Sequence, residues 1–152
     1  AGAQTKPSKL LAGYSALLGL TLHSFFDGVA IASGFLVSEN LGVLFFLGVL
    51  LHKLPEGVTV SSIMLASGLG RQRAIGAGLV LGAATILGAL VTAAVAPLAR
   101  HGLALAAGVT LYVAASNLVP EIQRSRRIRT TLAFLGGAVA LLLLRVFAAG
   151  GS

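Results

Sequence analysis

The chain has 152 residues, of which 57% are hydrophobic and 10% are charged, and its formal net charge is +7. Soluble domains usually carry about 25% charged residues, so this composition excludes a domain whose whole surface faces water. The hydrophobicity also excludes a disordered chain. The lack of cysteine excludes a disulfide scaffold, a zinc finger and a cysteine nucleophile. The composition therefore indicates an integral membrane protein.

Five long apolar stretches follow one another along the chain, and each reaches the roughly 20 residues that a helix needs to cross the bilayer. They are residues 10–37, 41–67, 74–97, 102–121 and 131–149. Loops are predicted at residues 38–40, 70–73, 97–102 and 124–127, with a loop tail at 1–9 and a short tail at 150–152. The predicted fold class is all-α, a polytopic membrane helix bundle with five spans joined by short loops.

Basic residues are unevenly distributed between the two sides of this predicted bundle. One side has eight of them: Lys6, Lys9, Arg71, Arg73, Arg124, Arg126, Arg127 and Arg129. The other side has Arg100 and Arg145. The positive-inside rule places the richer side in the cytoplasm and the C-terminus outside. We therefore expect a multi-pass protein of the plasma (inner) membrane, whose basic residues face anionic lipid and bind no nucleic acid.

The third span contains a GxxxG motif, formed by Gly78 and Gly82. Such spacing lets helix backbones approach closely in lipid. It predicts close helix packing, either inside the bundle or in a homodimer.

Five ionisable side chains lie near the centres of the first two spans: His23, Asp27, His52, Lys53 and Glu56. An ionised group at this depth costs about 2.5–3.5 kcal/mol even on the lowest scales, so a functional site is the default interpretation. The alternative is an all-protein network, in which Lys53 and a protonated histidine neutralise the two acids.

The two charged segments repeat one another. HSFFDGVAIAS at residues 23–33 aligns with HKLPEGVTVSS at residues 52–62, and four of eleven positions are identical. Consecutive spans run in opposite directions, so the pair forms an inverted repeat, and an inverted repeat around a midplane site is typical of transporters. A polar clamp between helices needs no such duplicate, which favours the functional site.

The spacing within each segment suits a metal ion. In both spans the histidine and the carboxylate are four residues apart, so they lie on one face of a helix, one turn apart. The predicted ligands are therefore His23, Asp27, His52 and Glu56. Two nitrogens and two oxygens suit a borderline divalent cation. Zn²⁺ is the first choice, and Fe²⁺, Mn²⁺, Co²⁺ and Cd²⁺ stay open.

Pro55 and two glycines fit the same site. Pro55 has no N–H, which frees the carbonyl of Leu51 next to His52. Such a carbonyl is tolerated at membrane depth where it faces protein or a water-filled path. Gly28 and Gly57 each follow the carboxylate of their segment, and we expect each to let the other helix of the pair come close.

These segments resemble the motifs of the ZIP family of divalent metal transporters. HSFFDG at residues 23–28 resembles the family's fourth-helix motif, and HKLPEG at 52–57 resembles its fifth-helix motif; NLVPE at 117–121 also fits. The resemblance covers essentially the whole chain, as helices four to eight. It implies a path between the two motif helices that moves the cation into the cytoplasm. Asn117 and Glu121 are either an exit position or a solvated helix end.

Family members often have a second metal site beside the first. The resemblance places it at the residue after each motif's first position, together with an acid from the sixth helix. Here those positions hold Ser24 and Lys53, and the stretch at 74–97 has no acid. We therefore expect a single metal, with the Lys53 ammonium near the lost second cation. The simpler alternative is that Lys53 only pairs with Glu56 or Asp27.

Family members usually have eight spans, and the first three have no counterpart here. The chain is thus interpreted as a fragment, a chain cleaved in the preceding loop, or a reduced homologue completed by an oligomer. Two functions other than transport stay open. One is a non-transporting metal-binding fragment or sensor subunit. The other is an intramembrane metal-dependent hydrolase, which the absence of an HExxH motif argues against, so no enzyme is expected.

Overall fold

The computed structural model describes residues 6–113 and 115–116, and beyond them residues 128, 132, 135–137, 139–140, 142–143 and 146. The chain divides into two compact units, Ala1–Ala106 and Ala107–Ser152. All five ionisable residues of the paired segments lie in the first unit. Asn117 and Glu121 lie outside the described residues, as does about half of the predicted fifth span.

Four helices follow one another along the described chain: α1 (Lys6–Val37), α2 (Glu39–Ala66), α3 (Arg71–Ala94) and α4 (Ala96–Val113). The described residues between 128 and 146 are also helical, and none of the described residues lies in a strand. The all-α prediction is therefore confirmed. Helices α1, α2 and α3 are long and apolar enough to cross a membrane, as a membrane helix bundle requires.

The connections between helices are shorter than predicted. Ser38 alone separates α1 from α2, and its Oγ accepts a hydrogen bond from the N–H of Leu41 at 3.2 Å, which caps α2. The loop predicted at 97–102 is helical instead, because α4 begins at Ala96. Pro97 lies in the first turn of α4, where its missing N–H would have no partner within the helix in any case.

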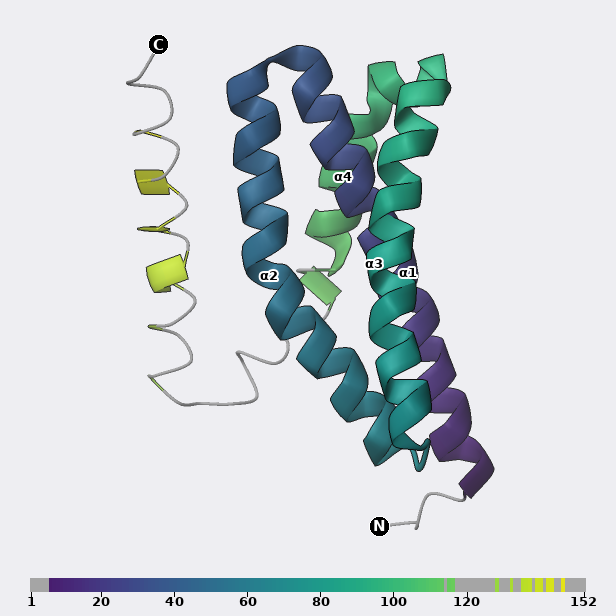
Figure 1. Cartoon of the computed structure of the whole chain (residues 1–152). Helices are drawn as coiled ribbons and strands as arrows, with labels where there is room; N and C mark the ends of the chain where they lie inside the picture. Colours follow the sequence, from purple (N-terminus) through teal and green to yellow (C-terminus); the bar gives the residue numbers. More distant parts are fainter. Residues whose placement is uncertain are drawn as a thin grey trace. The chain divides into compact units, whose positions relative to one another are not determined.

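In the first unit, α1 packs along both α2 and α3, and α2 and α3 also contact each other (Figure 1). Its contact with α3 is the closest, since a Cβ at Gly28 would collide with the carbonyl oxygen of Thr85, and one at Gly88 with that of Phe25. This corrects the expectation for the two glycines. Gly28 lets α3 rather than α2 approach closely, and a Cβ placed at Gly57 would have no neighbour within 4 Å in the described chain.

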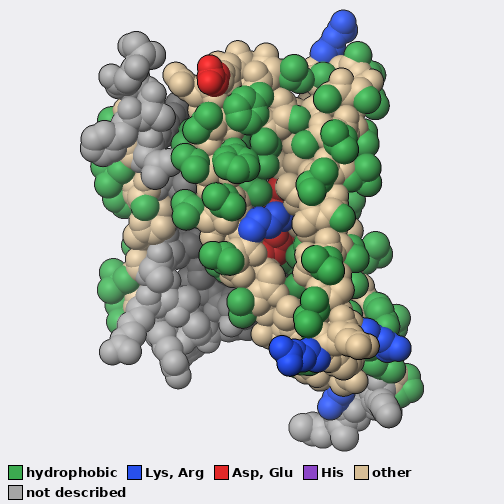
Figure 2. Space-filling view, viewed as in Figure 1, with side chains coloured by type: hydrophobic (Ala, Val, Ile, Leu, Met, Phe, Trp, Pro, Cys, Tyr) green, Lys and Arg blue, Asp and Glu red, His purple; other side chains and the backbone are tan. Residues whose placement is uncertain are grey.

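The buried core of the first unit holds α2 against α3 near one end. It consists of Val60, Met64, Leu69, Ala74, Ala77 and Leu81. Large apolar side chains also cover much of the outer surface, as Figure 2 shows. Exposing such a surface to water is unfavourable, whereas contact with lipid is not. The apolar surface therefore agrees with a bundle whose outer faces contact acyl chains.

Candidate metal centre

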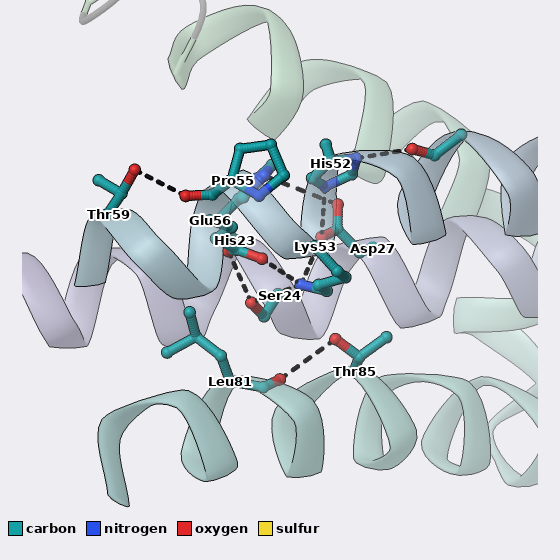
Figure 3. Close-up of polar contacts among 11 residues, drawn as sticks. His23, Ser24, Asp27, His52, Lys53, Pro55, Glu56, Thr59, Leu81 and Thr85 are labelled. Atoms are coloured by element: carbon teal, nitrogen blue, oxygen red, sulfur yellow. Dashed lines mark hydrogen bonds and ion pairs between the residues drawn. The ribbon is translucent and has the colours of Figure 1, made fainter. Parts of the chain in front are cut away.

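Helices α1 and α2 bring two imidazoles to one carboxylate (Figure 3). Nε2 of His23 lies 3.7 Å from Oδ1 of Asp27, and Nε2 of His52 lies 3.1 Å from Oδ2 of the same residue. One ligand atom from each of the three residues lies within 4.8 Å of the others. Three of the four predicted ligands therefore form one cluster, with two nitrogens and a carboxylate. Catalytic zinc sites use three protein ligands of this kind and keep a fourth position open.

His52 is oriented by its own helix. Its Nδ1 lies 2.9 Å from the carbonyl oxygen of Gly48, one turn earlier. A carbonyl oxygen only accepts, so Nδ1 donates, and Nε2 is the nitrogen that faces Asp27. Metal-binding histidines commonly donate their second ring nitrogen to a carbonyl in this way. The sequence analysis did not identify Gly48, although its position four residues before His52 is a signal that could have found it.

Glu56 lies outside the three-residue cluster. Its Oε1 accepts a hydrogen bond from Oγ of Ser24 at 2.9 Å, and its Oε2 pairs with Nζ of Lys53. The residue is only 8% exposed, so these contacts replace water rather than compete with it. The fourth predicted ligand is thus close to the cluster, but both of its oxygens are engaged elsewhere.

Lys53 connects the two carboxylates. Its Nζ donates to Oγ of Ser24 at 2.8 Å, to Oδ2 of Asp27 at 3.0 Å and to Oε2 of Glu56. An ammonium has three donors, and all three are used. With neutral imidazoles, two carboxylates and one ammonium leave a formal charge of −1. The charge pairing of the alternative network is therefore present in the structure, and it shares Asp27 with the histidine cluster.

A groove of about 310 Å³ runs between α2 and α3, beside this network. Lys53 and Glu56 line it among apolar side chains, and Figure 2 shows basic and acidic atoms in the middle of an otherwise apolar face. Gly57, Gly78 and Gly82 also line the groove, with no neighbour within 4 Å of a Cβ placed there. Among the described residues, no other helix thus approaches Gly78 or Gly82 as closely as α1 and α3 approach each other at Gly28 and Gly88.

Pro55 lies inside α2, as its place between His52 and Glu56 requires. Its carbonyl oxygen accepts a hydrogen bond from Oγ1 of Thr59 at 2.8 Å. Nδ1 of His23, in contrast, is buried and has no hydrogen-bond partner among the described residues. The two histidines therefore differ: α2 fixes the ring of His52 through a carbonyl, while the ring of His23 contacts Asp27 through Nε2 and has no described partner at Nδ1.

Comparison with known proteins gives a consistent result. The family model described as ZIP Zinc transporter matches residues 2–145. The chain is 32% identical to the Zinc transporter ZIP13 homolog of Drosophila melanogaster, over 90% of this chain and 41% of that protein. It is 33% identical to Zinc transporter ZIP13 of Danio rerio, over 91% and 43%, and 31% identical to Zinc transporter SLC39A7 of Canis lupus familiaris, over 88% and 32%.

The chain therefore spans less than half the length of these curated relatives. No solved structure matches it.

Proposed function

The chain belongs to the ZIP family of zinc transporters, and from this premise we propose that it forms the metal path of a transporter for a divalent cation, Zn²⁺ first. One observation carries the proposal: the cluster of His23, Asp27 and His52, contributed by two adjacent long apolar helices. Imidazole and carboxylate donors suit zinc, and they also accept Fe²⁺, Mn²⁺, Co²⁺ or Cd²⁺.

The proposed site is single and lies near the middle of the spans. His23, Asp27, His52 and Glu56 are its proposed ligands, although Lys53 and Ser24 contact both oxygens of Glu56 in the structure. Lys53 occupies the place where a second cation would otherwise balance the two acids. We further propose that the cation moves into the cytoplasm, that the C-terminus is extracytoplasmic, and that a homodimer or further N-terminal helices complete the path.

Because the family is one of transporters, the intramembrane hydrolase is set aside. The remaining alternative is a chain that binds metal without transporting it. The experiment below also tests this alternative, because the chain spans less than half the length of its relatives. The cluster of His23, Asp27 and His52 supports metal binding in both cases, so a measurement of zinc flux across the membrane distinguishes the two functions.

The test is zinc uptake by liposomes that hold the 152-residue chain and a zinc-sensitive dye. The variant His52→Ala removes one cluster nitrogen. The matched control His101→Ala removes an exposed histidine of α4. We expect uptake by the native chain and by the control, and none by His52→Ala.

Zinc binding that depends on His52 but gives no uptake would favour a binding subunit over a complete path. Equal uptake by all three proteins, or no zinc binding by any, would contradict the proposal.

A further inference from the structure

We propose that Lys53 is a tethered cation that withholds Glu56 from the metal cluster. In this inference, metal first binds through His23, Asp27 and His52, and Glu56 joins only when the ammonium moves away. The inference rests on the proposed function and makes Lys53 the residue that sets the number of ligands and hence the affinity.

The first step of the argument is the state of Glu56. A carboxylate ligand must direct a lone pair at the ion, and here Oε1 accepts from Ser24 while Oε2 pairs with Lys53. Lys53 and Glu56 are three residues apart on α2, so the pair forms on one helix face without any movement of the backbone. Holding Glu56 away from the cluster therefore needs only the Lys53 and Ser24 side chains.

The second step is competition at Asp27. Its Oδ2 lies 3.0 Å from Nζ of Lys53 and 3.1 Å from Nε2 of His52. A divalent ion bound by Asp27 and His52 would lie within a few ångströms of the ammonium. Two cations so close in a poorly solvated site repel one another strongly. Metal binding and the present position of Lys53 therefore oppose each other.

The third step is that Lys53 has somewhere to go. Its side chain is 21% exposed and lines the groove between α2 and α3, whose volume is about 310 Å³. A lysine has a flexible four-carbon stem, so the ammonium can leave the carboxylates while α2 stays in place. The site then has two arrangements, one with three ligands and the ammonium inside, and one with Glu56 free.

The consequence suits a cargo site, where binding must be strong enough for entry and weak enough for release. With Lys53 inside, a divalent ion brings the formal charge from −1 to +1, which favours release. With Lys53 in the groove, Asp27 and Glu56 balance the divalent ion to a formal charge of zero, and Glu56 is free to become a fourth ligand.

The test is a double-mutant cycle on zinc affinity, measured by calorimetry on the purified chain in detergent. The variants are Lys53→Met, Glu56→Gln and their combination. We expect Glu56→Gln alone to change the affinity by no more than about twofold. We expect Lys53→Met to tighten binding by roughly 10- to 100-fold, and Glu56→Gln to remove most of that gain in the Lys53→Met background.

Two controls accompany the cycle. Lys53→Arg keeps the cation and is expected to bind zinc like the native chain, and Lys9→Met removes an exposed lysine of α1 far from the site. If Lys53→Met does not fold, Lys53→Gln replaces it in the same cycle, since its amide removes the charge but keeps a donor for Ser24.

An equal effect of Glu56→Gln in both backgrounds would overturn the inference, and so would an unchanged affinity in Lys53→Met. Zinc binding by the native chain that His23→Ala and His52→Ala abolish would leave the proposed function standing in either case. A native chain that binds no zinc would contradict both.

Discussion

Asp27 is the side chain that the histidine cluster and the lysine network share. Its Oδ1 faces His23, and its Oδ2 contacts both His52 and Lys53. The residue is 5% exposed, so solvent screens these interactions little. A carboxylate at this position stabilises the Lys53 ammonium, and under the proposed function it also stabilises the metal ion that the site binds.

Substituting Asp27 by asparagine keeps the shape of the side chain and removes its charge. We expect Asp27→Asn to weaken zinc binding by roughly 100-fold. Losing a residue that only hydrogen-bonds a metal ligand already weakens metal binding by about 10- to 100-fold, so the loss of a ligand's charge should reach the upper end of that range. The matched control is Glu39→Gln, which removes an exposed acid in the first turn of α2. Calorimetric titration with zinc measures both variants, and equal affinities of Asp27→Asn and the native chain would contradict the assignment of Asp27 as a ligand.

Removing the Lys53 ammonium is expected to lower the stability of the folded chain when no zinc is added. Lys53→Met leaves Asp27 and Glu56 as two buried acids without a cation, and breaking a buried pair by removing one partner costs about 3 kcal/mol. We therefore expect a lower midpoint of thermal unfolding without metal, and recovery at saturating zinc, since a ligand that binds the folded state stabilises it. Lys9→Met, assayed by the same melting curves, is expected to match the native chain at both zinc concentrations.

Among the helices, α1 owes its close contact with α3 to small residues. Gly28 on α1 and Gly88 on α3 bring the two backbones into direct contact, at the depth where Asp27 faces α2. Without a hydrophobic force between helices in lipid, such close packing is a main source of association. The contact also fixes the rotation of α1, and hence the direction in which the face with His23 and Asp27 points.

Alanine at Gly28 tests this contact, because its Cβ would collide with the carbonyl oxygen of Thr85. Overpacking of this kind costs about 1–3 kcal/mol, so we expect Gly28→Ala to lower the thermal midpoint and to weaken zinc binding. Gly19→Ala lies on the same helix with no neighbour within 4 Å, and there alanine is expected to stabilise by about 0.5–1 kcal/mol through helix propensity. A drop of the same size in both variants would show that the backbone contact is not the cause.

The existence of α1, α2 and α3 and their approximate extent could be predicted, because a span of lipid demands a long apolar stretch whatever its neighbours are. The sharing of a face by His23 and Asp27 also followed from helical periodicity. The helix against which each face packs could not be predicted from periodicity. Periodicity says that Gly28 and Gly57 follow their carboxylates, and only the packed bundle shows that Gly28 meets α3 while Gly57 meets no described residue.

The candidate site could likewise be predicted only in part. Residue type and spacing were enough to select the two histidines and Asp27. The position of Glu56 depends on side-chain rotamers and on the contacts that Ser24 and Lys53 make with its two oxygens, and neither can be derived from spacing along one helix.

For the whole molecule, the distribution of charge between the two ends of the bundle sets the expected orientation. The first turns of α1 and α3 lie at one end of the first unit, and the junction of α1 with α2 lies at the other (Figure 1). Lys9, Arg71 and Arg73 are at the first end, while Glu39 is at the second. The positive-inside rule therefore predicts that the start of α3 lies in the cytoplasm and the junction of α1 and α2 outside.

Single cysteines can test this orientation directly, because the chain has no cysteine of its own and the native protein is an unlabelled background. Asn40→Cys and Gln72→Cys introduce exposed thiols at the two ends of the first unit. In intact cells we expect a membrane-impermeant maleimide to label Asn40→Cys but not Gln72→Cys, and to label both once the membrane is permeabilised. The reverse pattern would place the basic end outside. The inverted repeat could then still bind metal at the same depth, but the proposed direction of transport would lose its support, since that direction depends on which end of the path faces the cytoplasm.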